Sequence, residues 1–353
     1  MRRGPRRQRG MILIAVLFFI ALLVSGVATF MRRATMDGMI ARNRDLASRS
    51  EALARGGVQL ATALLLQDRL DEQEALPPQG RREKEATSFR SETRRDLWAK
   101  IGEVEIPTAD GGRLRLHIED SGSRLNLNAL FDEEGKAQPD AELFLTAFFE
   151  KVIGEMPLRE EEKNYDSQVL AQNLIDYVDA DDLQPDGDSE DEYYQLQQPP
   201  YRAANRPLLS IDELGLVEGF DNALVEAIRP YVTVYPYTGG GGINPNTAPA
   251  HVLATLFYGI SPDFRLADED TVRHILEMRE GDTMFCEDTA NGAGCIPLRE
   301  AGVEATPFPP PTYETDVFQV SAEASYGGVR RTIETVIDRS EPTSPLILSW
   351  RVR

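Results

Sequence analysis

The sequence is poor in the residues on which zinc sites and nucleophilic catalysis depend. It has two cysteines and three histidines among 353 residues. His117 falls in an alternating strand pattern, whereas His251 and His274 fall in ordinary helical contexts. The sequence has no nucleophile elbow, phosphate-binding loop or histidine-rich metal motif. We therefore predict that the protein is not an enzyme.

The two cysteines stand close together in the sequence. Cys286 and Cys295 are nine positions apart, in a segment that also contains Gly292 and Gly294. Two thiolates without further ligands do not complete a zinc shell. In an oxidising compartment, a disulfide that closes this loop is the simplest interpretation, and two free thiols are the alternative.

Positive charge is scarce outside the N-terminus. The chain has 38 Lys and Arg against 58 Asp and Glu, which gives a net charge of −20. Five of the arginines lie within the first ten residues, so without this leader the count is 33 against 58, or −25. Such an acidic body is repelled by phosphate backbones, which argues against nucleic acid as a partner and favours divalent cations.

Charge is absent altogether from the segment 11–30, from Met11 to Phe30. Twenty apolar residues are enough to cross a bilayer as a helix. The arginine-rich leader would stay in the cytoplasm, which sends the rest of the chain outward. A secretory signal cleaved near Ser25–Ala28 is one interpretation. A retained anchor is the other, and it is favoured because helix-permissive sequence continues past Phe30 without a proline until Pro77.

The remaining pattern predicts an α+β fold. Helical spacing continues to about Leu70, and an alternating pattern at 113–119 predicts a half-buried strand. From Leu143 to about Leu298 the chain has the pattern of short helices broken by Pro and Gly, and strand patterns return in the segment 317–352. Strands that flank a helical block indicate a sheet domain with an α-helical insertion.

An acidic segment lies inside the helical block. Asp176 to Tyr194 contains nine carboxylates and no Lys or Arg. Hard oxygen ligands on a turn rich in Gly and Pro suit Ca²⁺, although the spacing is not that of an EF-hand. A merely solvated acidic loop is the alternative. A catalytic carboxylate pair is less favoured, because it needs burial and this segment is polar throughout.

Two segments resemble helix-hairpin-helix units, Leu208–Phe220 and the stretch from Ile243 to Leu256. In other proteins such units place backbone N–H groups on DNA phosphates. Here Glu218 and Asp221 stand where a DNA-binding hairpin favours Gly and Lys. We interpret both segments as structural or protein-binding elements, with DNA binding or uptake as the alternative function.

Six motifs follow one another along the chain: the Gly10–Met11 junction with its anchor, Glu51–Gly57, Leu125–Leu130, Asp179–Tyr194, Pro200–Pro207 and Ile243–Ala248. Together, and in this order, they make the chain similar to the K-type minor pseudopilins of type II secretion systems. Pilin-like precursors are cut after a Gly, before the apolar helix, and carry Glu at the fifth mature position. Ala15 replaces that Glu here, which suits a subunit that no neighbour precedes in the fibre.

The resemblance implies a fold and a division of the chain. The expected fold is α+β, with a long pilin-like N-terminal helix packed on an antiparallel sheet and a large inserted α-helical domain. The expected parts are a leader at 1–10, a transmembrane and assembly helix at 11–30, a pilin-like domain at 31–130 and 311–353, and the insertion at 131–310.

The resemblance also implies a function. The protein is expected to be a non-enzymatic subunit at the tip of the periplasmic pseudopilus, where it initiates pseudopilus assembly and supports secretion. Its expected partners are the I and J minor pseudopilins, the H and G pseudopilins, secreted cargo and a prepilin peptidase that cleaves after Gly10 and methylates Met11. Its expected location is the bacterial inner membrane, with a single pass and a periplasmic body.

Calcium binding in the acidic segment is implied as well. The expected ligands are Asp179, Asp181, Glu190 and Asp191, with Asp182 and Asp188 as further candidates. The resemblance does not assign the cysteine pair.

Overall fold

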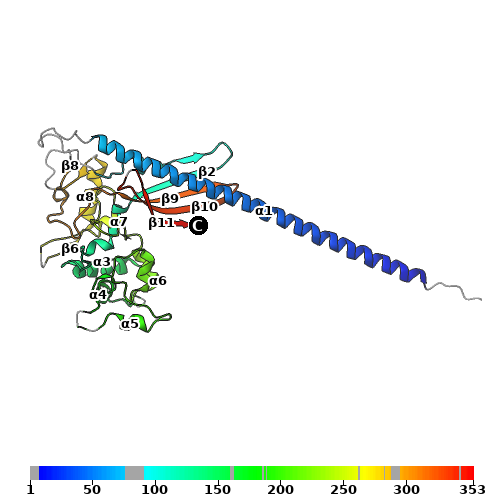
Figure 1. Ribbon diagram of the computed structural model, residues 1–353, viewed down its shortest axis with the longest axis horizontal. Helices are drawn as coiled ribbons and strands as arrows, with labels where there is room; N and C mark the ends of the chain where they lie inside the picture. The colour runs from blue at the N-terminus through cyan, green and yellow to red at the C-terminus, as the bar shows by residue number, and fades with distance from the viewer. Residues whose placement is uncertain are drawn as a thin grey trace, which may run out of the picture.

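A long N-terminal helix, α1 (Gln8–Ala75), dominates the shape of the molecule (Figure 1). The computed structural model describes residues 8–75, 91–159, 163–184, 187, 189–260, 263–281, 283–287, 295–341 and 343–353. The apolar stretch of α1 reaches a mean hydropathy of 2.9 over 18 residues, none of them buried. In the described part of the chain it is the one helix long and apolar enough to cross a membrane.

The C-terminal half of α1 packs on a five-stranded antiparallel sheet. The strand order is β1-β2-β9-β10-β11, so strands from both sides of the helical block form one sheet. Gly327 and Gly328, both at positive φ, make the tight turn between β9 and β10. The predicted α+β fold is therefore confirmed. The strands are β1 (Glu105–Pro107), β2 (Arg113–Asp120), β9 (Val317–Tyr326), β10 (Val329–Asp338) and β11 (Leu346–Val352).

Small residues allow α1 to approach the sheet closely. Ala54, Val58, Ala61 and Leu65 follow the helical period and are buried against the sheet. Gly57 lies on the same face and leaves room for the apolar side chains of β2. The alternation that predicts β2 therefore reflects burial against α1.

The inserted elements lie at the end of the molecule opposite the free part of α1 (Figure 1). Their core is aromatic, with Phe144 and Phe148 of α3 in ring contact with Phe257 and Tyr231. The short strand pairs within this block were not predicted. The helices are α3 (Ala141–Glu155), α4 (Ser167–Val178), α5 (Asp191–Gln195), α6 (Asn222–Ile228), α7 (Ala250–Leu253) and α8 (Glu269–Glu280), with strands β4 (Val232–Thr233), β5 (Phe257–Tyr258), β6 (Arg265–Leu266), β7 (Met284–Phe285) and β8 (Cys295–Ile296). Strand β3 (Leu125–Asn126), which pairs with β4, precedes the insertion.

Buried asparagines form hydrogen bonds that join segments of the insertion to one another and to the sheet. The Asn128 side chain donates to the Leu208 and Val234 carbonyls and accepts from the Leu208 N–H. The Asn244 amide donates to the Asp120 carboxylate at the end of β2, at 2.9 Å. The two Asn-containing motifs of the resemblance are therefore structural tie points, because each buried amide satisfies backbone or carboxylate groups that would otherwise lose their hydrogen bonds.

A disulfide joins Cys286 to Cys295, with 5.8 Å between their Cα atoms. It links the ends of β7 and β8, which run parallel. Of the two interpretations that the sequence left open, the structure has the disulfide.

Candidate metal centre

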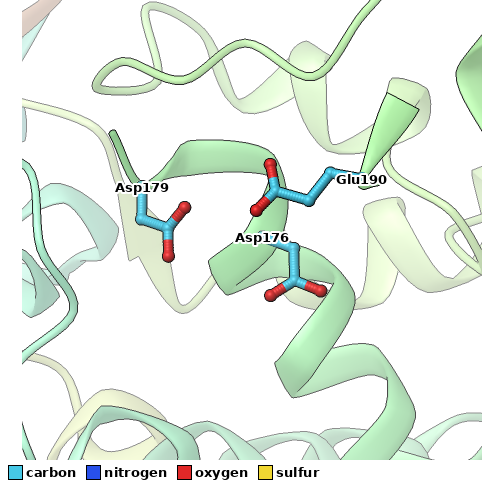
Figure 2. Close-up of side chains that lie close together, drawn as sticks. All are labelled: Asp176, Asp179 and Glu190. Atoms are coloured by element: carbon cyan, nitrogen blue, oxygen red, sulfur yellow. The ribbon is translucent and has the colours of Figure 1, made fainter. Parts of the chain in front are cut away.

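Three carboxylates, which we call the acidic cluster, come together where the chain leaves α4 and enters α5: Asp176, Asp179 and Glu190 (Figure 2). Helix α4 begins after Asp166, whose side chain accepts hydrogen bonds from the first N–H groups of the helix, at 3.0 and 3.1 Å. Its apolar face, including Leu170, is buried in the core of the insertion. This packing fixes the last turn of α4, where Asp176 lies.

The chain leaves α4 at Asp179 and returns at Glu190, the residue before α5. The Glu190 N–H contacts the Asp182 carbonyl at 3.4 Å, which closes the loop between them. One oxygen from each of the three carboxylates lies within 4.8 Å of the other two. Figure 2 shows the side chains around a shared space, with Asp179 opposite Glu190.

Two members of the cluster are buried and the third, Asp179, is half-buried, and the three carboxylates repel one another. Glu190 is 3% exposed and Asp176 is 8% exposed. Both carboxylate oxygens of Glu190 and Oδ1 of Asp179 are buried without a hydrogen-bond partner. Burial, together with repulsion from Asp179 and Asp176, raises the pKa of Glu190 to about 8. Burial and repulsion from Asp181 and Asp176 raise the pKa of Asp179 to about 6.

These residues fit a hard divalent cation. Buried carboxylates without partners are costly, and a bound cation removes the cost by supplying charge and accepting lone pairs. Ca²⁺ takes six to eight oxygens in a flexible shell, of which Asp176, Asp179 and Glu190 would provide the carboxylate share. Zn²⁺ fits less well, because the cluster offers neither imidazole nor thiolate. The bound ion would hold the loop between Asp179 and Glu190 against the end of α4.

The structure brings together two of the six predicted ligands, Asp179 and Glu190. Three others make different contacts. Asp181 accepts from the Leu183 N–H and Asp182 accepts from the Asn205 amide. Asp191 accepts from the Ala203 N–H and lies 3.6 Å from the Arg202 guanidinium. The sixth, Asp188, lies outside the described residues.

The third member of the cluster, Asp176, was not singled out from the sequence. Its spacing, three residues before Asp179, puts the two at the end of one helix, but that spacing does not distinguish it from the other eight carboxylates. What distinguishes Asp176 is its burial, which depends on how α4 packs. The interpretation of the segment as polar throughout, without the burial that a catalytic carboxylate pair needs, was wrong for Asp176 and Glu190, which are buried.

The predicted processing site lies at the start of α1. Gly10 falls within the helix and Met11 is 73% exposed. The geometry does not test cleavage or methylation, which stay predictions.

The chain is similar to known proteins along most of its length. Residues 123–237, which include the acidic cluster, match the family model described as type II secretion system (T2SS), protein K. The type II secretion system protein K of Pseudomonas aeruginosa is 32% identical over 259 residues, 73% of this chain and 69% of that protein. The chain belongs to the type II secretion system protein K family.

Further relatives agree with membership of the protein K family. The protein K of Klebsiella pneumoniae is 34% identical over 64% of this chain and 62% of its own length. The crystal structure of the GspK-GspI-GspJ complex from the enterotoxigenic Escherichia coli type 2 secretion system contains a chain of the same fold. That match has a TM-score of 0.57 at 20% identity and covers 89% of this chain and 99% of the other. The resemblance drawn from the six motifs is confirmed at the level of the family.

Proposed function

We propose that this protein is a non-enzymatic minor pseudopilin at the tip of the type II secretion pseudopilus. In this role it would initiate pseudopilus assembly and support protein secretion across the outer membrane. It would be held in the inner membrane by residues 11–30, with its body in the periplasm. Membership of the protein K family and the apolar stretch of α1 support this proposal.

The main support for a position at the pseudopilus tip is the location of the insertion. It lies at the end of the body opposite the free part of α1 (Figure 1). Subunits of a helical filament use one interface toward the membrane and another away from it. A bulky insertion on the far side would obstruct the second interface, and Ala15 removes the carboxylate that would neutralise a preceding subunit's amine. Both features favour a subunit that begins the fibre.

The fold shared with a chain of the GspK-GspI-GspJ complex supports I and J minor pseudopilins as partners. The H and G pseudopilins would follow below them, and secreted cargo would meet the exposed end. The test is co-purification of the full chain with the I and J pseudopilins of the same organism from detergent-solubilised membranes. A stable stoichiometric complex is expected, and a chain that elutes alone would contradict the proposed assembly role.

Processing is tested separately. A Gly10→Trp variant should retain its leader, because a prepilin peptidase requires a small residue before the cut, and secretion should stop. A Gly26→Trp variant, which changes an exposed glycine further along the same helix, is the matched control and should be cut normally. Normal cleavage of Gly10→Trp would rule out a prepilin-type leader.

Calcium in the acidic cluster is part of the proposal. The buried, unpartnered oxygens of Glu190 and Asp179 support it. DNA binding stays the alternative function, although no observation among the described residues specifically favours it. Salt-sensitive retardation of duplex DNA by the full chain would favour that alternative.

A further inference from the structure

A cavity of about 470 Å³ lies beside the acidic cluster, between the turn after Phe131, the end of α4 and the segment 237–240. This volume is within the range of sites that bind small molecules or anchoring side chains. Much of its wall is apolar. The apolar wall residues are Ala129, Phe131, Val178, Ala180, Pro207 and Tyr237.

The rim of the cavity is acidic. Asp132, Glu133 and Glu134 line one side and are exposed. Among the described residues that line the cavity, Arg206 is the one cation, and its guanidinium is 3.1 Å from the Glu213 carboxylate. The cavity therefore combines an apolar interior with a negative mouth. Such a site selects an apolar group that carries positive charge beside it.

We propose that this cavity binds a polypeptide segment in which one aromatic or large aliphatic side chain is flanked by Lys or Arg. The apolar side chain would fill the cavity as an anchor, and the flanking cations would face Glu133 and Glu134. A buried apolar anchor within a charged rim is the usual arrangement of a peptide-recognition site. A phosphate-bearing ligand is disfavoured by the acidic rim. A second copy of this chain is disfavoured by the charge of the insertion, which holds 36 Asp and Glu against 11 Lys and Arg.

The wall of the cavity is continuous with the acidic cluster. Val178 and Ala180, which line the wall, are the two neighbours of Asp179 in the chain. The Ala180 N–H donates to the Gly135 carbonyl at 3.0 Å, which joins the wall to the acidic rim turn. A cation that fixes Asp179 would therefore fix the wall of the cavity, so peptide and cation should bind cooperatively. This coupling rests on the proposed calcium site, whereas peptide binding itself does not.

The test measures binding of a fluorescein-labelled Gly-Lys-Phe-Lys-Gly peptide to the full chain in detergent micelles by fluorescence anisotropy. Two matched peptides replace Phe by Gly or both Lys by Glu. The Phe- and Lys-containing peptide should bind at least about tenfold more tightly than either control, because binding needs both the anchor and the charges. Equal binding of the Gly peptide would show non-specific charge attraction and overturn the proposal.

Two variants locate the site. Thr238→Trp places a large side chain in the exposed lining of the cavity and should weaken binding by about tenfold or more. Leu143→Trp, on the exposed face of α3, is the matched control and should leave the affinity unchanged. Unchanged affinity in Thr238→Trp, with thermal unfolding like that of the parent, would overturn the proposal.

A charge-matched pair of double variants tests the rim. Glu133→Gln with Glu134→Gln should weaken binding several-fold, and Glu150→Gln with Glu280→Gln, which removes two exposed acids elsewhere, should not. Equal losses in both would show that the peptide responds to net charge alone and would overturn the assigned rim.

Calcium tests the coupling. Affinity in 1 mM Ca²⁺ should exceed affinity in EGTA by at least about fivefold, the usual lower limit of coupling between two sites. Asp179→Asn should abolish the difference. If calcium stabilises the protein but leaves peptide affinity unchanged, the coupling is wrong and the calcium site stands. If calcium has no effect on stability while Thr238→Trp still weakens the peptide, the calcium site is wrong and the peptide site stands.

Discussion

Arg339 is the largest side chain that is fully buried among the described residues. Its Nη1 donates to the Leu65 carbonyl and to the Asp68 carboxylate, at 3.0 and 2.7 Å, and its Nη2 donates to Glu92. Its guanidinium also lies over the Phe318 ring, 4.5 Å from the centroid. The network joins the end of α1 to the end of β10 and to the chain that enters the sheet. A buried charge network is expensive to form but more expensive to break.

The first prediction concerns this arginine. Arg339→Met should destabilise the protein by about 3–5 kcal/mol, because it leaves the Glu92 charge buried without its partner. Urea unfolding of the full chain in micelles measures it. Arg330→Met breaks an exposed pair with Glu323 and should cost about 1 kcal/mol or less. Adding Glu92→Gln to Arg339→Met should recover part of the loss, and no recovery would mean that packing, not charge, is responsible.

Glu190 gives the second prediction, on pH and calcium. Its pKa is raised to about 8 in the folded protein, well above the range of an unfolded Glu. In EGTA the folded state therefore binds more protons than the unfolded state between about pH 4.5 and 8, so stability should fall as the pH rises through this window. Calcium at 100 times its dissociation constant should add about 2.7 kcal/mol at pH 8.

Glu190→Gln separates these effects. The variant should be more stable than the parent in EGTA at pH 8, because it removes a buried charge, and it should lose the calcium response. Glu150→Gln changes an exposed glutamate away from the cluster and should keep the calcium response of the parent. A calcium response that survives in Glu190→Gln would remove Glu190 from the ligand set.

At the scale of elements, α1 contains two neighbouring glycines, Gly56 and Gly57, that differ in their surroundings. A Cβ at Gly57 would lie 2.7 Å from Leu114 Cδ1 and 3.2 Å from Ala322 Cβ. A Cβ at Gly56 would meet nothing within 4 Å. The close approach of helix and sheet therefore requires one glycine and not the other.

The third prediction follows from that difference. Gly57→Val should destabilise the protein by about 1–3 kcal/mol, because the helix must move away from β2 and β9. Gly56→Ala should stabilise it by about 0.5–1 kcal/mol, since glycine is costly inside a helix. Thermal unfolding compares the two. Equal effects would show that helix propensity, rather than packing, governs this part of α1.

The elements that were predictable from the sequence have a strong local signal. The charge-free residues 11–30 and the alternation of β2 each depend on neighbours a few positions away. The pairing of β3 with β4 does not, because each strand has two residues and the two pair across about a hundred residues of chain. A strand of two residues is too short to show the alternating pattern by which strands are recognised in a sequence.

The sequence predicts that carboxylates are concentrated in this segment, but it does not predict which three of them form the acidic cluster. Local sequence shows that carboxylates gather between Asp176 and Tyr194. Which of them are buried depends on the packing of α4 and on where the loop returns at Glu190, and both are tertiary effects. This is why Asp179 and Glu190 were anticipated and Asp176 was missed, while Asp181 and Asp182 make other contacts.

At the scale of the molecule, charge is divided between the two parts. Residues 131–310 carry a net charge of −25, whereas residues 31–130 and 311–353 together hold 22 Lys and Arg and 22 Asp and Glu. The negative field therefore comes from the end of the molecule opposite the apolar stretch of α1. Cationic partners would be steered to that end, and the neutral pilin-like part can pack against other subunits without repulsion.

The last prediction concerns the exposed section of α1 that lies between the apolar residues 11–30 and the part packed on the sheet. Met36, Met39 and Ile40 are 61%, 63% and 46% exposed. At 100° per residue they share a stripe with Ala54 and Leu65, which the sheet covers further along α1. No described residue packs against Met36, Met39 and Ile40. We therefore expect the helix of another pseudopilin to pack against this part of the stripe.

Ile40→Glu should therefore reduce co-purification with the I and J pseudopilins by about tenfold or more, because it places a charge in an apolar helix contact. Its thermal unfolding should match the parent, since the body does not contact this residue closely. Ala34→Glu adds the same charge on the opposite face of the same section and should leave the complex intact. If both variants release the partners equally, charge near the membrane is responsible and the stripe is not the interface; if neither does, the body alone holds the complex together.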